Sequence, residues 1–226
     1  MKYNGGMSNL CYSPPVDTGL DIVFQDDALV VVNKPSGLLS VPGRGPDKQD
    51  CMISRVQARF ADALIVHRLD METSGILLLA RGKSVHRCMS RAFQDREVEK
   101  QYTAVVEGAL LQPEGMVDLP LICDWPNRPR QKVDHGQGKP SLTRYQQLSY
   151  DAGLAVTRVA LFPVTGRSHQ LRVHMLSLGH AIVGDPLYAM PDVQKKASRL
   201  LLHASHLSIR HPITHDILIL NSEPTF

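Results

Sequence analysis

The sequence has 226 residues, 43% apolar and 21% charged, a composition typical of a globular protein with one large domain or two small ones. Cys11, Cys51, Cys88 and Cys123 are too far apart for a CxxC pair, which excludes a zinc ribbon and a dithiol redox motif. We expect neither a signal peptide nor a membrane span, because residues 1–21 lack an apolar segment and the apolar runs elsewhere are short. The net charge of +3 is compatible with a nucleic-acid partner but does not by itself indicate one.

Glycine and proline pairs interrupt residues 1–19, which we expect to form a flexible arm before a single folded domain at 20–226. Short β-branched runs and amphipathic spacing then predict the first elements. In chain order these are a hairpin of strands at 22–24 and 29–33, a loop at 41–46, a helix at 52–60 and a buried strand at 76–80.

The second half of the chain predicts mainly strands. The expected elements are a helix capped by Ser84 with apolar positions from 85 to 93, a strand at 101–106, a Pro- and Gly-containing excursion at 123–140, strands at 143–150 and 154–162, a helix from Ser168 to Leu178, and strands at 200–209 and 216–220. Many strands without βαβ alternation predict an α+β fold with a largely antiparallel sheet.

Asp70 is the first candidate for chemistry. It lies in the segment HRLDMETSG, residues 67–75, two residues after Arg68 and between the apolar runs 63–66 and 76–80. An Asp in such a place can simply cap a turn. The alternative is a reactive carboxylate that a nearby cation holds in a partly apolar cleft.

Arg172 is the candidate for that cation. It lies in the helix that follows Gly166 and shares a face with His169, beside an apolar stripe, so it needs a carboxylate partner. The pair can be structural with any acid, or it can be formed with Asp70 and keep that carboxylate ionised. Arg167, at the start of the helix, can bind phosphate.

Tyr102 and several basic groups are candidates for contacts with a base or a polyanion. A strand tyrosine usually packs in a core, but on a cleft wall it offers a platform for a stacked base. Arg128, Arg130 and Lys132 lie near Trp125 in the 123–140 excursion, a combination that suits a folded polyanion. The same cations can equally form a solvated surface.

The segment at 67–75 resembles the catalytic motif of the RluA family of pseudouridine synthases. Four further segments resemble motifs of this family in the same order, and the matches span residues 21–220. They are NKPSG at 33–37, KQYTAVVEG at 100–108, GRSHQLRVHM at 166–175 and RLLLHA at 199–204. The segment DLPLICDWPNRPRQK at 118–132 is similar to members with dual specificity for a tRNA anticodon stem-loop and 23S rRNA.

The resemblance implies a pseudouridine synthase fold, with a mixed, largely antiparallel central sheet, flanking helices and a catalytic cleft. It implies an isomerase in which Asp70 is catalytic, Tyr102 is the active-site tyrosine and Arg172 pairs with the aspartate. We further expect RNA contacts by Arg68, Arg167 and His169 and by the 123–132 loop.

We also expect a cytoplasmic enzyme without an appended S4 domain or an obligate protein partner. We expect neither a metal nor a cofactor, because isomerisation requires no redox group. Two other classes stay open for the sequence. One is a noncatalytic RNA-binding module, and the other is an Asp-dependent nucleoside or glycoside hydrolase, which would usually need a second carboxylate.

Overall fold

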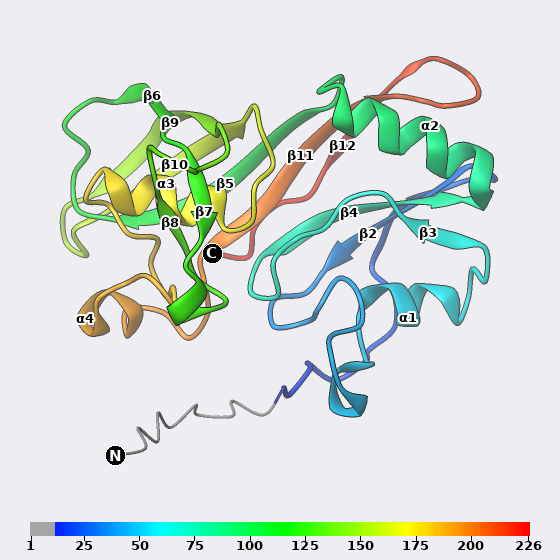
Figure 1. Ribbon diagram of the computed structural model, residues 1–226, viewed down its shortest axis with the longest axis horizontal. Helices are drawn as coiled ribbons and strands as arrows, with labels where there is room; N and C mark the ends of the chain where they lie inside the picture. The colour runs from blue at the N-terminus through cyan, green and yellow to red at the C-terminus, as the bar shows by residue number, and fades with distance from the viewer. Residues whose placement is uncertain (1–11) are drawn as a thin grey trace.

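The computed structural model describes residues 12–226, which form a mixed sheet of ten strands with a separate two-stranded hairpin (Figure 1). The main path through the sheet has the order β1-β2-β4-β11-β5-β10-β9-β6, with β3 beside β4 and β12 beside β11. The strands are β1 (Ile22–Gln25), β2 (Leu29–Lys34), β3 (Ala63–Ile65), β4 (Ser74–Arg81), β5 (Glu99–Glu107), β6 (Glu114–Asp118), β9 (Leu142–Asp151), β10 (Val156–Pro163), β11 (Leu202–Arg210) and β12 (Ile217–Asn221). The hairpin consists of β7 (Leu121–Cys123) and β8 (Gln131–Val133). This architecture confirms the predicted α+β class and its largely antiparallel sheet.

Four α-helices flank the sheet in the described part of the chain. They are α1 (Met52–Gln57), α2 (Gly82–Gln94), α3 (Gln170–Ser177) and α4 (Pro191–Gln194). No helix within residues 12–226 is long and apolar enough to cross a bilayer. The sequence pattern does not predict β3, β6, the β7–β8 pair or α4, because each is short or lies in a segment rich in turn residues.

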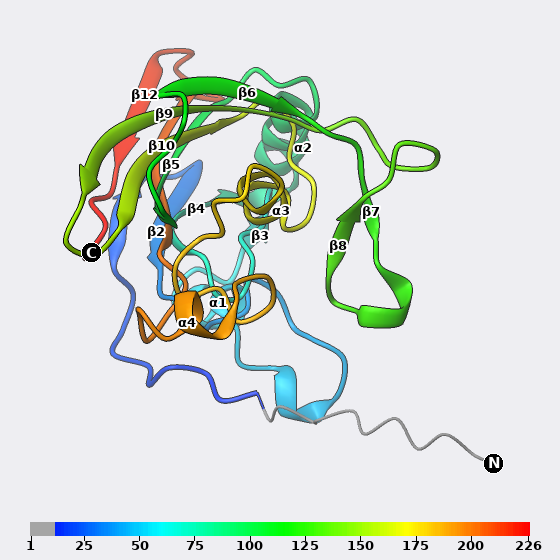
Figure 2. The same ribbon diagram turned by 90° about the vertical axis from the view of Figure 1, so that its left-hand side faces the viewer.

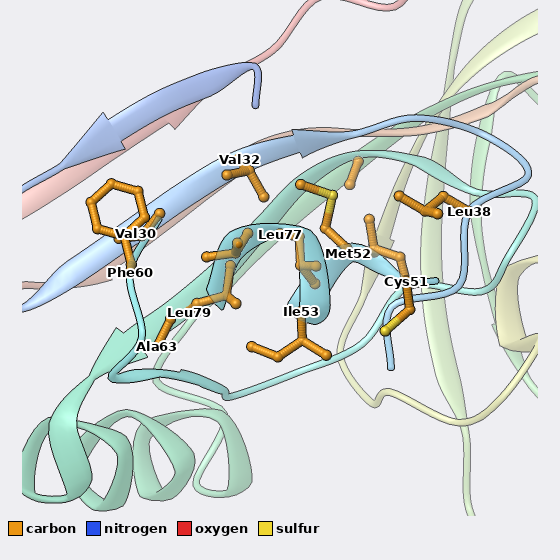
Figure 3. Close-up of a cluster of buried hydrophobic side chains, with 13 residues drawn as sticks. Val30, Val32, Leu38, Cys51, Met52, Ile53, Phe60, Ala63, Leu77 and Leu79 are labelled. Atoms are coloured by element: carbon orange, nitrogen blue, oxygen red, sulfur yellow. The ribbon is translucent and has the colours of Figure 1, made fainter. Parts of the chain in front are cut away.

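Two buried clusters lie on one face of the sheet and a third lies on the other. The first packs α1 against β2 and β4, where Met52 and Ile53 meet Val32 and Leu77 (Figure 3). The second packs α3 against β5 and β10, and Tyr102 contacts both of these clusters. The third lies under α2. The face that carries α1 and α3 therefore has a junction between two cores, and Tyr102 lies in it.

The only parallel pairing among the described strands joins β4 to β11 and requires a glycine. Gly75 pairs with Ala204 and has a φ of +110°, which L-residues with a side chain rarely adopt. A Cβ atom at Gly75 would lie 2.3 Å from the Ala204 carbonyl oxygen. This close approach lets β11 lie between β4 and β5.

The expected caps of two helices are wrong. The helix expected after Ser84 begins at Gly82, with Arg81 at its N-cap and no side-chain cap, because β4 runs directly into it. The second helix begins at Gln170 rather than after Ser168. His169 has a left-handed backbone, so the α-helix cannot begin before Gln170. The Gln170 side chain accepts hydrogen bonds from the Arg167 N–H and the Thr165 hydroxyl, which holds the segment before the helix in a turn.

The arm expected at 1–19 and the domain expected at 20–226 stay predictions. Residues 1–11 lie outside the described part of the chain. Residues 12–19 have no helix or strand, yet they contact the body. The Tyr12 hydroxyl donates to the Asp50 carbonyl and accepts from the Leu39 N–H, and the Arg55 guanidinium donates to the Pro15 carbonyl.

Replacing Gly75 by Ala tests the close approach of β4 and β11. The added methyl group would meet the backbone, which cannot move without breaking the parallel pair, so we expect a loss of roughly 3 kcal/mol or more in the free energy of unfolding. Gly82→Ala is the matched control, because Gly82 also has a positive φ but no atom lies within 4 Å of the place that its methyl group would take. Urea unfolding should show a control loss of only about 1–2 kcal/mol. Equal losses would exclude the close approach as the cause.

Candidate functional site

Asp70 lies in the loop between β3 and β4, and the loop is held by its backbone on both sides of this residue. The Ser40 hydroxyl donates to the Leu69 carbonyl at 2.7 Å and accepts from the Leu69 N–H at 3.1 Å. After Asp70, the Gly37 N–H donates to the Met71 carbonyl at 2.9 Å. The position of Asp70 is therefore fixed by its neighbours, without a hydrogen bond from any described residue to its own carboxylate.

Lys34 ties the 33–37 segment to the same loop. Its side chain is fully buried, and its Nζ donates to the carbonyls of Pro35, Leu38 and Met71 at 2.7–3.0 Å. Burial lowers the pKa of Lys34 to about 7, while three carbonyl acceptors match the three N–H donors of its ammonium form. The two segments that resembled family motifs thus meet in one hydrogen-bonded unit.

His67 anchors the beginning of the loop. Its Nε2 accepts the Leu78 N–H of β4 at 3.0 Å, and its ring stacks on Phe93 of α2 with centroids 4.5 Å apart. Burial, together with the charge of Lys100, lowers the pKa of His67 to about 3. The imidazole is therefore neutral and structural, which the sequence did not reveal.

The Asp70 carboxylate faces a small pocket of about 100 Å³ at the junction of the two cores. Its side chain is 28% exposed. Within residues 12–226 it accepts no hydrogen bond, while the Asp70 backbone carbonyl accepts one from the Thr73 N–H. The turn is thus closed by the backbone, and the interpretation of Asp70 as a side-chain cap finds no contact to support it.

Tyr102 forms another wall of this pocket. It projects from β5 on the face that carries α1 and α3 and contacts both clusters there. Burial, and next the charge of Asp70, raise the pKa of its hydroxyl above the ordinary value, so the phenol stays neutral. Its ring is placed to support a planar group that enters beside Asp70.

Arg172 lies in the pocket wall, but its main partner is not the expected one. Its Nε and Nη2 donate to the two carboxylate oxygens of Asp185, both at 2.7 Å, whereas its Nη1 lies 3.9 Å from Asp70 Oδ2. The Arg172 and Asp185 side chains are 2% and 0% exposed. Burial works to lower the pKa of Arg172, but the bonds and charge of Asp185 and the charge of Asp70 leave it raised.

The predicted ion pair of Arg172 with Asp70 is present at 3.9 Å, but the hydrogen-bonded partner of Arg172 is Asp185. A buried guanidinium is best neutralised by a bidentate carboxylate, and Asp185 supplies it. Asp185 lies outside the helix, 13 residues further along the chain, and no spacing rule would select it. What Asp70 receives is the nearby positive charge of an arginine that another residue holds in place.

A larger groove of about 970 Å³ shares Asp70, Tyr102 and His169 with the pocket. Cations line it, and Asp70 is the one carboxylate among its described lining residues. The lining cations are Arg44, Arg68, Arg96, Lys100, Arg128 and Arg167. The groove is thus far more positive than the net charge of the chain suggests, as polyanion binding requires.

The predicted RNA-binding residues divide into two groups. Arg68, Arg167 and His169 line both the pocket and the groove. Arg128 lines the groove, where its guanidinium stacks on Trp125 at 4.6 Å from the ring centroid. The other groove cations, Arg44, Arg96 and Lys100, could not be assigned to the site from the sequence, because they come from separate loops and strands.

Arg130 and Lys132 are not part of the groove wall. Lys132 lies on β8 next to Gln131, which does line the groove, and neighbouring strand residues point to opposite faces. Lys132 Nζ lies 3.9 Å from the Asp134 carboxylate instead. The proposed RNA contacts of these two residues stay predictions.

The described residues contain no cluster of three or more His, Cys, Asp or Glu side chains suited to a metal ion.

Comparison with known proteins identifies the family of this chain. Residues 28–177 match the family model described as RNA pseudouridylate synthase. The chain belongs to the RNA pseudouridylate synthase family. Its members act on RNA, and the catalytic type is an isomerase.

Named relatives of this pseudouridylate synthase cover nearly the whole chain. It is 54% identical over 207 residues to the dual-specificity RNA pseudouridine synthase RluA of Escherichia coli (strain K12), with 92% of this chain and 93% of that protein covered. It is 51% identical to RluA of Pasteurella multocida (strain Pm70), with 97% and 100% covered.

Solved structures agree. Human RNA pseudouridylate synthase domain containing 1 is 30% identical with a TM-score of 0.78, covering 95% of this chain and 87% of that one. Human RNA pseudouridylate synthase domain containing 4 is 27% identical with a TM-score of 0.72, covering 90% and 88%. The pseudouridine synthase fold is confirmed.

Membership of the pseudouridylate synthase family does not favour either alternative class. The pocket agrees with this, since Asp70 is the one acid among its described lining residues, whereas a glycoside hydrolase usually places two carboxylates around the scissile bond. Asp185 cannot serve as the second, because it is fully buried and bound to Arg172.

Double-mutant cycles in urea unfolding should separate the two partners of Arg172. Arg172→Met leaves Asp185 buried without its partner, so we expect a loss of about 3–5 kcal/mol. Its coupling with Asp185→Asn should exceed about 2 kcal/mol, whereas its coupling with Asp70→Asn should be smaller, about 0.5–1 kcal/mol, because that ion pair is longer and partly exposed. A larger coupling with Asp70 than with Asp185 would contradict the arrangement described above.

Proposed function

We propose that this pseudouridylate synthase converts specific uridines to pseudouridine in a tRNA anticodon stem-loop and in 23S rRNA. Two relatives of about 50% identity carry the name dual-specificity RNA pseudouridine synthase, and residues 118–132 resemble that branch. The observation that carries the proposal is a single carboxylate, free of hydrogen bonds within the described structure but beside the Arg172 guanidinium, in a small pocket that opens from a cationic groove. A cytoplasmic location is part of the proposal, because the proposed substrates are tRNA and ribosomal RNA.

We assign the reactive group to Asp70. Isomerisation breaks the bond between N1 and C1′ and forms one between C5 and C1′, while C5 loses a proton and N1 gains one. A carboxylate can attack the sugar or the base, or it can remove a sugar proton, and each route needs an ionised oxygen free of other bonds. The Asp70 carboxylate has that freedom within the described structure, and the charge of Arg172 favours its ionised form.

We assign complementary roles to Tyr102 and Arg172. The neutral Tyr102 ring provides an apolar wall on which the uracil can stack as it turns between its two points of attachment. Arg172 cannot leave, because Asp185 holds two of its nitrogens, so it acts as a fixed charge beside Asp70. A charge already fixed before the reaction requires no reorganisation when charge develops in the substrate.

The uridine must leave its stack to reach Asp70, since the pocket is narrow and lies behind the groove. Arg68 is exposed at the entrance, two residues before Asp70, and we assign to it the space that the uridine vacates or a flanking phosphate. His169 and Arg167 also line both the pocket and the groove. The remaining groove cations hold the RNA backbone.

Asp70→Asn should abolish pseudouridine formation while preserving the fold and the binding of RNA. The amide keeps the size of the side chain but removes its charge, so we expect at least a roughly 1,000-fold loss in single-turnover rate on a short stem-loop RNA, about 4 kcal/mol in the barrier. Removing the one acid of the groove should leave RNA affinity unchanged or slightly tighter. A rate within about tenfold of wild type would remove Asp70 from the reaction.

Arg128→Ala and Lys132→Ala form a matched pair on the β7–β8 hairpin. Arg128 lines the groove with Trp125, so its removal should lower kcat/KM on the stem-loop and reduce the slope of log Kd against log salt by about one. Lys132 is not part of the groove wall, so its removal should change both quantities less than that of Arg128. The reverse order of effects would show that RNA approaches the other face of the hairpin.

A further inference from the structure

The Tyr188 hydroxyl lies between the β7–β8 hairpin and the catalytic pocket. It accepts the backbone N–H of Gln131 in β8 at 2.7 Å, and it lies 2.7 Å from Nδ1 of His169 in the pocket wall. Figure 2 shows the hairpin standing apart from the main sheet. One phenol oxygen thus bridges two segments that are far apart in the sequence.

The contact is unusual within the hairpin. Among the described residues, the bond from Gln131 to Tyr188 is the only hydrogen bond that joins residues 122–132 to anything outside the hairpin; their remaining bonds are internal. The hairpin carries Trp125 and Arg128, which line the RNA groove. Apart from the chain connections at its base and the packing of β8 beside α3, one hydroxyl holds the hairpin in its direction relative to the pocket.

Tyr188 is itself held by the residues that hold Arg172. The Asp185 carboxylate accepts the N–H groups of Leu187 and Tyr188 at 2.8 and 3.1 Å, in addition to the guanidinium of Arg172. That guanidinium lies 5.0 Å from the centroid of the Tyr188 ring. Contacts with Asp185 and Arg172 thus hold Tyr188 in place, and Tyr188 in turn holds the hairpin through Gln131.

The hydrogen bonds of Tyr188 favour one tautomer of His169. Since the Gln131 N–H already donates to the Tyr188 oxygen and no other acceptor for the hydroxyl lies among the described residues, the hydroxyl satisfies its proton best by donating to His169 Nδ1. The ring proton of a neutral His169 is then on Nε2. Burial raises the pKa of Tyr188 to about 12 and lowers that of His169, which keeps both groups neutral.

The backbone of His169 supports a functional role for this arrangement. His169 has a φ of +52°, in the left-handed region that non-glycine residues seldom occupy, at the N-cap of α3. This conformation places its ring against Tyr188, edge to face with centroids 5.6 Å apart, while the residue lines both the pocket and the groove.

We propose that Tyr188 is a positioning residue that joins the RNA-binding hairpin to the catalytic pocket and presents His169 to the RNA as an Nε2–H donor. The proposal rests on the proposed function and extends it. When the target loop contacts Trp125 and Arg128, the bonds from Gln131 to Tyr188 and from Tyr188 to His169 set the position of that loop relative to the catalytic pocket. A hairpin held in this way aligns the flipped uridine with the carboxylate.

Tyr188→Phe tests the proposal, because it removes the hydroxyl and keeps the ring beside Arg172. We expect kcat on a short stem-loop RNA to fall roughly 10- to 100-fold, with a smaller change in KM because the groove cations are untouched. Tyr150→Phe on the exposed end of β9 is the matched control and should behave as wild type.

Two measurements separate positioning from a merely structural effect. Hydrogen exchange of the Gln131 amide should be faster in Tyr188→Phe, and the nitrogen chemical shifts of His169 should show a mixture of tautomers in place of one. A kcat within about threefold of wild type, or an unchanged exchange rate and tautomer, would overturn the proposal.

His169→Asn provides a second route if Tyr188→Phe does not fold, since Asn tolerates the left-handed backbone. It should lower kcat to a similar extent, and the double variant should be no slower than the slower single one, because the two groups act as a unit. Full additivity, or a fully active His169→Asn, would overturn the proposal. If the wild-type chain forms no pseudouridine on the stem-loop, the proposed function fails, whereas the exchange and tautomer measurements still test the contact.

Discussion

The bidentate bond between Arg172 and Asp185 is the interaction on which the site depends. Two charges that are both removed from water are tolerable only if each compensates the other with good geometry. Here the carboxylate also accepts two backbone N–H groups of the segment 187–188, so the same pair fixes the guanidinium, the following turn and the aromatic ring beside it. Because Asp185 already binds two nitrogens of Arg172, Asp70 can lie near the guanidinium without forming a hydrogen bond to it.

A reactive carboxylate presents a conflict in a site that must also attract RNA. A close ion pair would hold Asp70 in place but would occupy its carboxylate oxygens. A carboxylate without nearby cations would repel the phosphates of the RNA. The structure resolves this by controlling the loop through backbone bonds from Ser40, Lys34 and Gly37, and by surrounding the acid with cations at a distance. The small overall charge of the chain conceals this local concentration.

Much of this architecture could be predicted from the sequence, and what could not has identifiable reasons. The alternating and buried strands, the amphipathic α2 and the order of motifs around Asp70, Tyr102 and Arg172 all follow from local pattern or resemblance. The partner of Arg172 could not be found in this way, because Asp185 meets it through a turn that has no periodicity. The start of α3 differs from the expected one because His169 adopts a left-handed backbone, which no local pattern indicates. The side of the hairpin that meets the groove depends on strand alternation in β8, which is too short to be recognised in advance.

The position of β11 has a consequence for how the enzyme acquires activity. This strand comes late in the chain, yet it lies between β4 and β5 and so joins one half-sheet that carries Asp70 to another that carries Tyr102 and Arg172. Every proposed catalytic residue is therefore synthesised before the strand that brings them together. Pairings between such distant segments form slowly, because a long loop must close first. A nascent chain that ends before residue 202 would contain all three proposed catalytic residues, but the two halves of the sheet would not yet be paired through β11. Catalysis would begin only when this last central strand is inserted.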